Sequence, residues 1–299
     1  NETCSELKVH YIELKNIGDS ILIQCDEIDI IVDAGIKRDG TEVVTPFLEE
    51  VVEDNIIEMA IVTHYDDDHY GGFVGLKNQL SVFNSDLIIN NLIDFGYRKR
   101  YEKTEYELAR ENLINEDNTN YYKIQDLFDD NNDERFNKIK LGDNCIIELL
   151  QTDYYDIEAD DNDRSITFLL TYNQVTFFFG GDITTTQEAR LLENYDLPQI
   201  DYYKASHHGS YTSNSREFLE VVNPSYIILN CVEGNSYGIP QKVAVEILDD
   251  FANGNIYVTG LNGTITVLVN ENNPLGTLTM SKSDTKFIDS NWYNEIMTN

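Results

Sequence analysis

The sequence predicts an α/β protein built as an αββα sandwich, in which two mixed sheets face each other and helices cover the outside. Short apolar runs bounded by turn residues recur along the chain and predict strands. In each half, a strand-rich stretch is followed by alternating strands and helices, as expected for two sheets with helices outside. The 299 residues, 41% of them hydrophobic, suffice for one large core, so we expect a single domain over residues 1–299.

The first half begins with three apolar runs, at residues 9–14, 21–25 and 28–32, which predict strands separated by short polar turns. Residues 43–52 have helical spacing, with Pro46 in the first turn. A strand over 59–62, a polar loop, a helix to about residue 80 and a strand over 86–91 follow. This part predicts one sheet with helices on one side.

Residues 93–140 differ in composition and are rich in Tyr, Asn and charged residues. Helical stretches are expected around 103–114 and 121–128. We interpret the segment as a mostly helical insertion that lies over the core.

In the second half, strands are expected at 145–150, 165–171, 174–179, 199–204, 226–231, 255–259 and 264–269. Helices are expected at 185–194, 215–222 and 240–251. Residues 270–299 form a C-terminal extension.

The chain is strongly acidic: 54 Asp and Glu residues against 21 Lys and Arg residues give a net charge of −33. Such a charge repels polyanions at long range. It argues against broad nonspecific binding to nucleic acid or to an anionic membrane, unless bound divalent metals or a local basic patch override it.

The four cysteines are far apart in the sequence and show no metal-binding spacing. Cys25, Cys145 and Cys231 lie at apolar runs, which predicts buried free thiols and favours a reducing, cytoplasmic compartment. No apolar run approaches the length of a membrane span, so a soluble chain is expected; a removed signal peptide would leave no trace.

The segment 63–72 (THYDDDHYGG) carries the densest chemistry in the chain and follows the apolar run 59–62. Two of the five histidines and three carboxylates lie within six residues, which is more ligand chemistry than a turn needs. His64 and Asp66 can face one metal ion, while Asp68 and His69 can turn toward a second. The alternative is a solvated acidic turn. Two glycines then allow a helix to start close to the metals without Cβ clashes.

Two later strands also end in ligand-type residues. Strand 174–179 delivers Asp182, which could bridge two cations or, alternatively, cap the next helix. Strand 199–204 is followed by His207 and His208, which suit one metal ligand and one neighbour that binds or protonates a reacting oxygen. A polar turn is the alternative. Lys204, at the end of that strand, can neutralise an anionic substrate.

In this order the motifs resemble the metallo-β-lactamase superfamily, and more narrowly the hydrolase domain of the ComEC-type DNA-uptake proteins. Further marks of the resemblance are the segments 16–20 (NIGDS), 32–35 (VDAG), 235–240 (NSYGIP) and 262–266 (NGTIT), together with Thr259. The resemblance extends over residues 8–269, with the insertion as its largest departure. It implies the metallo-β-lactamase form of the αββα sandwich, with two divalent metal ions, Zn²⁺ or Mn²⁺, at the strand ends along one edge.

The resemblance implies a ligand set of His64, Asp66, Asp68, His69, Asp182 and His207, with His208 as the alternative to His207. His64 and Asp66 would hold one metal. Asp68, His69 and one of the two later histidines would hold the other, with Asp182 between the metals.

At position 66 most of the superfamily has His, and a further His completes the first metal site. This chain has no His between His69 and His207, so Asp161 or Asp163 is the possible substitute ligand, or else water. Carboxylates in place of imidazoles shift the preference toward Mn²⁺ or Fe, although Zn²⁺ keeps its intrinsic affinity advantage.

Ile239 stands where the ComEC-like pattern usually has a His that would assist the leaving group. The spare member of His207 and His208, or a residue of the insertion, would then take that role. The neighbouring Asn235 and Tyr237 are candidate substrate contacts. So are Arg98 and Arg100 in the basic, aromatic run 97–103, which suits bases and phosphates but equally suits a solvated helix start.

The favoured function is a dinuclear metal-dependent hydrolase, a phosphodiesterase or nuclease in which a metal-bridging hydroxide oriented by Asp68 attacks phosphorus and His208 or His207 assists departure. The expected substrate is a nucleotide or single-stranded nucleic acid; a protein partner stays open. The alternatives are a hydrolase of another small ester, such as a lactone or a phosphocholine ester, and a metal- or ligand-binding sensor module with weak turnover. The membrane channel of the uptake proteins is absent from this chain.

Overall fold

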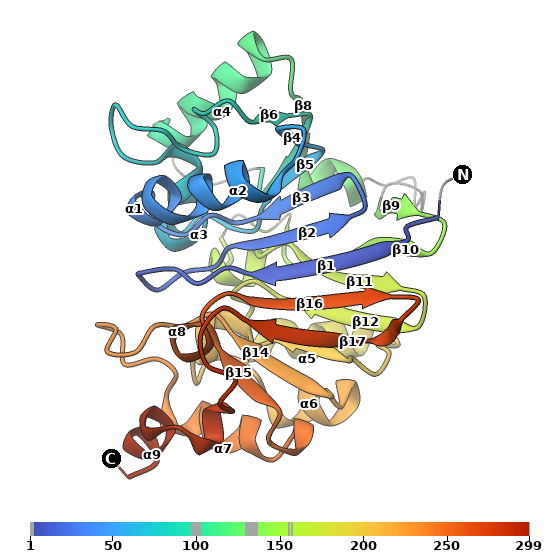
Figure 1. The fold of residues 1–299 in the computed structure, drawn as a ribbon, viewed down its shortest axis with the longest axis vertical. Helices are drawn as coiled ribbons and strands as arrows, with labels where there is room; N and C mark the ends of the chain where they lie inside the picture. Colours follow the sequence, from blue (N-terminus) through green and yellow to red (C-terminus); the bar gives the residue numbers. More distant parts are fainter. Residues whose placement is uncertain (1–2, 97–102, 129–136, 155, 157, 299) are drawn as a thin grey trace.

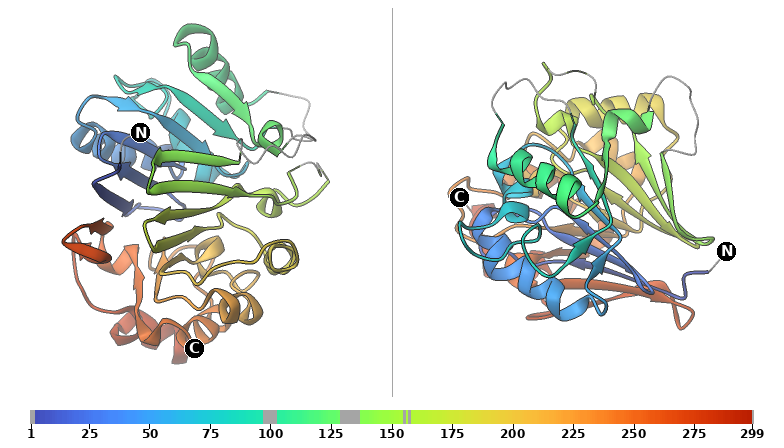
Figure 2. Two further views of the ribbon diagram at one scale, coloured as in Figure 1. Left: turned by 90° about the vertical axis from the view of Figure 1, so that its right-hand side faces the viewer. Right: turned by 90° about the horizontal axis from the view of Figure 1, so that it is seen from above.

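Two β-sheets pack face to face and form the centre of the protein (Figure 1). The structure is a computed structural model that describes residues 3–96, 103–128, 137–154, 156 and 158–298. Figure 2 shows the two sheets as separate layers, with helices on their outer sides. The αββα arrangement expected from the sequence is therefore confirmed.

The first sheet has eight strands in the order β17-β16-β1-β2-β3-β5-β7-β8. Its strands are β1 Glu6–Tyr11, β2 Ile21–Cys25, β3 Ile28–Val32, β5 Met59–Val62, β7 Asn91–Asp94, β8 Asn120–Lys123, β16 Ile265–Asn270 and β17 Asn273–Met280. Strands β3, β5, β7 and β8 are parallel, whereas β1, β2, β16 and β17 form antiparallel pairs. Strand β1 alternates half-buried and buried side chains, so one of its faces lies in the core.

The second sheet has seven strands in the order β15-β14-β13-β12-β11-β10-β9. Its strands are β9 Lys138–Gly142, β10 Cys145–Leu150, β11 Thr167–Tyr172, β12 Val175–Phe179, β13 Tyr202–Lys204, β14 Tyr226–Leu229 and β15 Ile256–Val258. Strands β12 to β15 run parallel to one another. A separate two-stranded sheet pairs β4 Ile56–Ile57 with β6 Ile88–Ile89.

Three apolar clusters hold the layers together. The central cluster lies between the sheets and includes Val9, Phe168, Phe179 and Ile265. Outside the first sheet, Leu48 and other apolar residues pack under α1 Lys37–Asp39, the π-helix Gly40–Val44, α2 Thr45–Val51 and α3 Asp67–Val74. Outside the second sheet, α5 Thr185–Asn194, α6 Arg216–Val222, α7 Lys242–Asp249 and α9 Asn291–Thr298 pack on the other cluster; α8 Thr259–Asn262 lies between β15 and β16.

Several expected elements differ in the structure. The helix expected to reach residue 80 ends at Val74, because Gly75 has a left-handed φ of 68°. In the insertion, α4 Glu105–Glu116 matches the expected helix, but 121–128 divides into β8 and the 3₁₀ turn Ile124–Phe128. The insertion therefore supplies an edge strand to the first sheet and most of β9 to the second. The C-terminal extension contributes β17, which pairs with β16.

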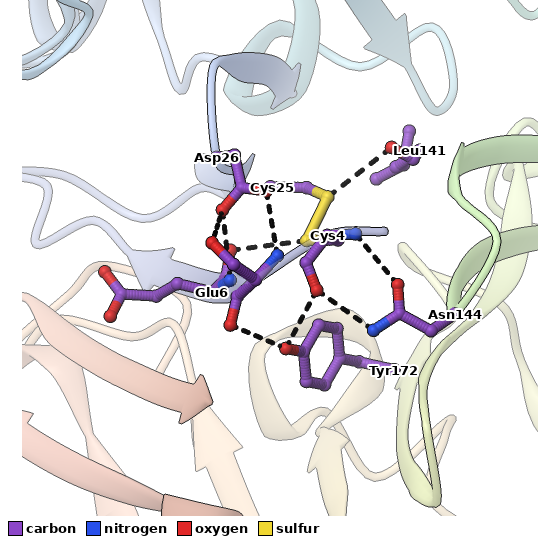
Figure 3. Close-up of a disulfide and its surroundings, with 8 residues drawn as sticks. Cys4, Glu6, Cys25, Asp26, Leu141, Asn144 and Tyr172 are labelled. Atoms are coloured by element: carbon purple, nitrogen blue, oxygen red, sulfur yellow. Dashed lines mark hydrogen bonds between the residues drawn. A yellow bond between two sulfur atoms is a disulfide. The ribbon is translucent and has the colours of Figure 1, made fainter. Parts of the chain in front are cut away.

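The expectation of a free thiol is wrong for Cys25, which forms a disulfide with Cys4 (Figure 3). Cys4 precedes β1 and Cys25 ends β2, so the antiparallel pairing of these strands brings them together. Cys145 and Cys231 are free and buried, as expected. The bridge removes the argument for a reducing, cytoplasmic compartment.

In the described parts of the chain, no helix combines the length and apolar character needed to cross a lipid bilayer.

Candidate metal centre

Ligand-type side chains from both sheets meet at one edge of the sandwich. His64 follows β5, Asp182 follows β12, and His207 and His208 follow β13. Each of these strands lies in the parallel part of its sheet, where carboxyl ends share an edge. The strand pattern of the sequence is thus what places these side chains together.

The Asp182 carboxylate is the centre of the cluster. Its Oδ2 lies 3.8 Å from the Nε2 of His64 and 3.2 Å from that of His69. The Nε2 atoms of His207 and His208 lie 3.7 and 3.4 Å from the same oxygen. Four imidazole nitrogens thus surround one buried carboxylate.

The unpaired atoms of this cluster fit divalent metal ions. Four buried atoms of the cluster have no hydrogen-bond partner among the described residues. They are the Nε2 atoms of His64, His69 and His208, and the Oδ1 atom of Asp182. Buried polar atoms are nearly always paired, so several converging unpaired ones call for a ligand. Imidazole nitrogens and carboxylate oxygens are the donors that Zn²⁺ and Mn²⁺ accept.

The opposite nitrogen of each buried ring is held by the protein. His69 Nδ1 lies 2.7 Å from Asp33 Oδ2, and His64 Nδ1 lies 3.0 Å from the hydroxyl of Thr63. Asp33 is itself fixed by the backbone N–H and hydroxyl of Thr63. His208 Nδ1 lies 3.1 Å from the carbonyl oxygen of Asn230. A partner at Nδ1 leaves Nε2 as the metal-binding atom.

Asp66 and Asp68 lie at the beginning of α3. Asp66 is the N-cap residue, but its carboxylate makes no capping hydrogen bond and lies 3.5 Å from His64 Nε2. Asp68 Oδ2 lies 3.3 Å from His208 Nε2 and 4.0 Å from His69 Nε2. Their side chains are 45% and 25% exposed, so the cluster opens to solvent on this side.

The two consecutive histidines occupy different places. Asp68, His69, Asp182 and His208 form one group whose ligand atoms all lie within 4.8 Å of one another. His207 is outside this group, is 23% exposed, and has Nδ1 3.2 Å from the hydroxyl of Thr212. Both histidines have left-handed backbone angles, with φ of 52° and 53°, a costly conformation that is typical of functional sites.

Charges in the cluster are strongly coupled. Burial alone would raise the pKa of Asp182, but His69 and His208 hold this pKa well below its usual range. Burial alone would lower the pKa of His69, but Asp182, Asp33 and Asp68 raise it well above 6.5. These carboxylates and the ring of His69 thus stabilise each other's charged forms.

The two candidate substitute ligands lie differently. Asp163 accepts hydrogen bonds from the backbone N–H and hydroxyl of Thr184, the N-cap residue of α5, so it has a structural partner. Asp161 is 43% exposed and ion-pairs with Arg164. Burial raises the pKa of Asp161, and the nearby charge of Asp66 adds to this effect. Of the two, Asp161 is thus the one near the Asp66 side of the cluster.

The structure also brings in two buried carboxylates that the sequence reasoning did not assign. Asp19 and Asp33 lie behind His208 and His69, in the segments NIGDS and VDAG, which were noted only as marks of a resemblance. A carboxylate directly after a buried strand, as in VDAG, is the signal that was available. Lys204 is only 1% exposed and ion-pairs with Asp19, so it lies behind the cluster rather than facing a substrate.

The loop after β14 is organised by Asn235, whose side chain bonds to the carbonyl of Val232 and the backbone N–H groups of Tyr237 and Ile239. The ring of Tyr237 is 67% exposed. Ile239 is buried and packs in the cluster outside the second sheet. Arg98 and Arg100 lie outside the described residues.

The formal charges around Asp182 match two divalent cations. The carboxylates of Asp19, Asp33, Asp66, Asp68 and Asp182 carry five negative charges, and Lys204 carries one positive charge. The remaining four negative charges equal the charge of two divalent ions, if the histidines are neutral ligands.

Comparisons with known proteins give the same fold. No family model matches the chain. It is 26% identical over 132 residues to ComE operon protein 3 of Bacillus subtilis; the matched stretch is 43% of this chain but only 17% of that protein.

The metallo-β-lactamase fold protein YhfI of Bacillus subtilis superposes with a TM-score of 0.50, at 11% identity over 84% of this chain and 96% of YhfI. Igni18, a metallo hydrolase of Ignicoccus hospitalis, gives a TM-score of 0.46, at 12% identity over 89% of this chain and 99% of Igni18. The superposition on YhfI shows that the chain has the metallo-β-lactamase fold.

Proposed function

We propose that this protein is a dinuclear metal-dependent hydrolase that cleaves phosphodiesters. The observation that carries the proposal is Asp182 Oδ2, which has four imidazole Nε2 atoms within 3.8 Å and lies where two groups of potential ligands meet. A carboxylate in this position suits a bridge between two cations.

The ligands divide into two groups around Asp182. Asp68, His69 and His208 would hold one cation, because their ligand atoms and those of Asp182 form the closest group. His64 and Asp66 would hold the other. Asp161 is our candidate for a further ligand of that cation, because it lies near Asp66. Two divalent cations would polarise a phosphoryl group and supply a strong nucleophile from water at neutral pH.

The side chains on the open side of the cluster would handle the substrate and the protons. Asp68 is partly exposed and adjoins both His69 and His208, so it can accept a proton from the attacking water. His207 is partly exposed, lies outside the closest ligand group, and is fixed by Thr212. It can therefore protonate the leaving oxygen, the role for which position 239 offers only a buried Ile.

The substrate class rests on two arguments. The resemblance to the hydrolase domain of DNA-uptake proteins favours a phosphodiester of a nucleotide or nucleic acid. The net charge of −33 disfavours long polyanions, because repulsion slows their approach. A nucleotide or a short single strand meets both conditions. Tyr237, with its ring exposed, is the candidate for base stacking.

The test combines metal analysis with hydrolysis. We expect two metal ions per chain by inductively coupled plasma mass spectrometry. We also expect cleavage of bis(p-nitrophenyl) phosphate, cyclic nucleotides or short single-stranded DNA with Mn²⁺ or Zn²⁺. Asp68→Ala should lower kcat on the order of 100-fold or more. Asp67→Ala is the matched control, since Asp67 is the preceding carboxylate in α3 and bonds to Tyr70 instead.

The proposal would be refuted if the protein held no metal after loading with Mn²⁺ or Zn²⁺. It would also be refuted if Asp68→Ala and Asp67→Ala had equal kcat. Cleavage of a lactone or a phosphocholine ester, with none of the phosphodiesters cleaved, would keep the metal site but replace the substrate class.

A further inference from the structure

The Asp19–Lys204 pair is a buried ion pair directly behind the candidate metal ligands. Lys204 Nζ lies 2.6 Å from Asp19 Oδ2, and the two side chains are 1% and 2% exposed. The ammonium group also donates to the carbonyl oxygen of Ala205 at 3.2 Å. An isolated buried charge is very costly, so each partner needs the other in this place.

Asp19 reaches both histidines of the closest ligand group from behind. Its Oδ1 lies 3.3 Å from His208 Nδ1, and its Oδ2 lies 3.9 Å from His69 Nδ1. Its backbone N–H donates to the backbone carbonyl of Asp68 at 3.2 Å. One residue thus contacts Asp68, His69 and His208.

The geometry sets which nitrogen of His208 faces the metal position. His208 Nδ1 has Asn230 O at 3.1 Å and Asp19 Oδ1 at 3.3 Å, both acceptors, so a proton at Nδ1 is favoured. Nε2 then carries the lone pair that a cation can take up, and it points at Asp68 and Asp182. Lys204 ion-pairs with the other oxygen of the same carboxylate, Asp19 Oδ2.

We propose that Asp19 and Lys204 are a positioning pair that holds His208 for the cation bound with Asp68, His69 and Asp182. The inference rests on the proposed dinuclear site and adds two residues that touch neither metal nor substrate. In metal sites, partners of this kind fix ring orientation, and their loss lowers metal affinity about 10- to 100-fold.

A change in the net charge of the site could also change cation affinity without any loss of positioning. Substitutions at Asp19 and Lys204 distinguish these two explanations. Asp19→Asn removes a negative charge, so it weakens cation binding under either explanation. Lys204→Met removes a positive charge while keeping a side chain of similar length. Charge alone would then strengthen cation binding, whereas lost positioning weakens it.

The experiment is a Co²⁺ titration of the metal-free full chain, followed by visible absorption and checked by metal content after gel filtration. We expect both variants to bind the Co²⁺ held by Asp68, His69, Asp182 and His208 about 10- to 100-fold more weakly, and to bind the other Co²⁺ normally. Far-UV circular dichroism and thermal unfolding report the fold in the same samples.

A matched control exists in the first sheet. Asp94 is a buried carboxylate that ion-pairs with Arg110 at 2.6 Å and accepts from Tyr106 and Tyr121. Asp94→Asn and Arg110→Met should lower stability and leave both Co²⁺ affinities unchanged.

Three outcomes would overturn the inference. They are tighter Co²⁺ binding by Lys204→Met, wild-type affinities in Asp19→Asn, or an equal loss of affinity in the Asp94 and Arg110 variants. A wild-type chain that binds no Co²⁺ would instead refute the proposed function, so the two failures are distinguishable.

Discussion

At the scale of single residues, the candidate centre brings buried charged side chains into contact with one another. Asp182, His69 and His208 are almost fully buried, and burial alone would neutralise each of them. Their mutual attraction instead keeps carboxylate and imidazolium charged in the metal-free chain. Cations would replace the protons of the histidines.

The pH dependence of the metal-free protein follows from these shifts. Burial would lower the pKa of His208, but Asp182 and Asp19 raise it well above 6.5. The pKa of His69 is likewise raised well above 6.5 by its carboxylate neighbours. A histidine with a raised folded-state pKa stabilises the fold fully below its unfolded pKa of 6.5, and this contribution is lost as pH rises through the folded-state pKa. We therefore expect the free energy of unfolding to fall from pH 6 to pH 9, measured by urea titration in EDTA.

Metal binding should show the opposite trend. Because a cation must displace the histidine protons, affinity should increase with pH over the same range. A competition assay with a chromophoric chelator measures it, and an affinity independent of pH would contradict the coupling.

Asp66 gives a third prediction at this scale. An imidazole in place of this carboxylate makes the first metal position softer and less negative. We expect Asp66→His to increase the affinity for Zn²⁺ relative to Mn²⁺ by on the order of 10-fold, from competition between the two ions. An unchanged ratio would show that Asp66 is not a ligand. Asp67→His, one residue along the helix, is the control.

At the scale of elements, the packing of α3 depends on close backbone contact at Gly72. A Cβ at Gly72 would lie 1.8 Å from the carbonyl oxygen of Ala34, and a Cβ at Gly40 would lie 2.2 Å from the Cα of Gly72. The contact holds α3, which carries Asp68 and His69, against the segment after β3. The paired glycines of the sequence thus serve helix packing next to the centre.

Gly72→Ala should therefore be strongly destabilising. We expect a loss of about 3 kcal/mol or more in the free energy of unfolding, because the obstacle is backbone that cannot move aside. Gly234→Ala is the comparison: its φ of 71° costs about 1 kcal/mol, but a Cβ there meets no atom within 4 Å. Chemical denaturation of both variants measures the difference, and equal losses would argue against the packing explanation.

The elements also show what the sequence can and cannot reveal. Strand β5 and helix α5 lie where expected, Met59–Val62 and Thr185–Asn194, because their apolar spacing and flanking turns are local signals. The segment 121–128 was expected to be helical, yet residues 120–123 pair with β7, a contact that local spacing does not encode. Asp19 shows the same limit, because its partners His208 and Lys204 are far along the chain.

At the scale of the whole molecule, the N-terminal segment is tied to both sheets. The disulfide joins Cys4 to the end of β2, and the Cys4 backbone bonds to Asn144 and Tyr172 of the second sheet (Figure 3). A third sulfur, that of Cys145, lies within 4.8 Å of both bridged sulfurs. Burial raises the pKa of Cys145 to about 12, so this thiol stays protonated and exchanges slowly with the bridge.

Reduction of the bridge should lower stability. The bridge closes a loop with a sequence separation of 21, for which chain entropy gives about 3 kcal/mol. We expect that loss in urea unfolding with and without a phosphine reductant, and two titratable thiols in the unreduced, denatured chain. Four thiols before reduction would contradict the bridge. Cys231→Ser, which leaves the bridge intact, should keep the sensitivity to reductant.

The position of β1 has a consequence for how the protein is made. Its two neighbours are β2, which follows within a few residues, and β16, whose Thr266 pairs with His10. A ribosome that has synthesised β1 must add some 250 residues before this second partner exists. Until then one edge of β1 is open to pairing with other chains. Folding of the first sheet is thus completed only late in translation, when β16 arrives.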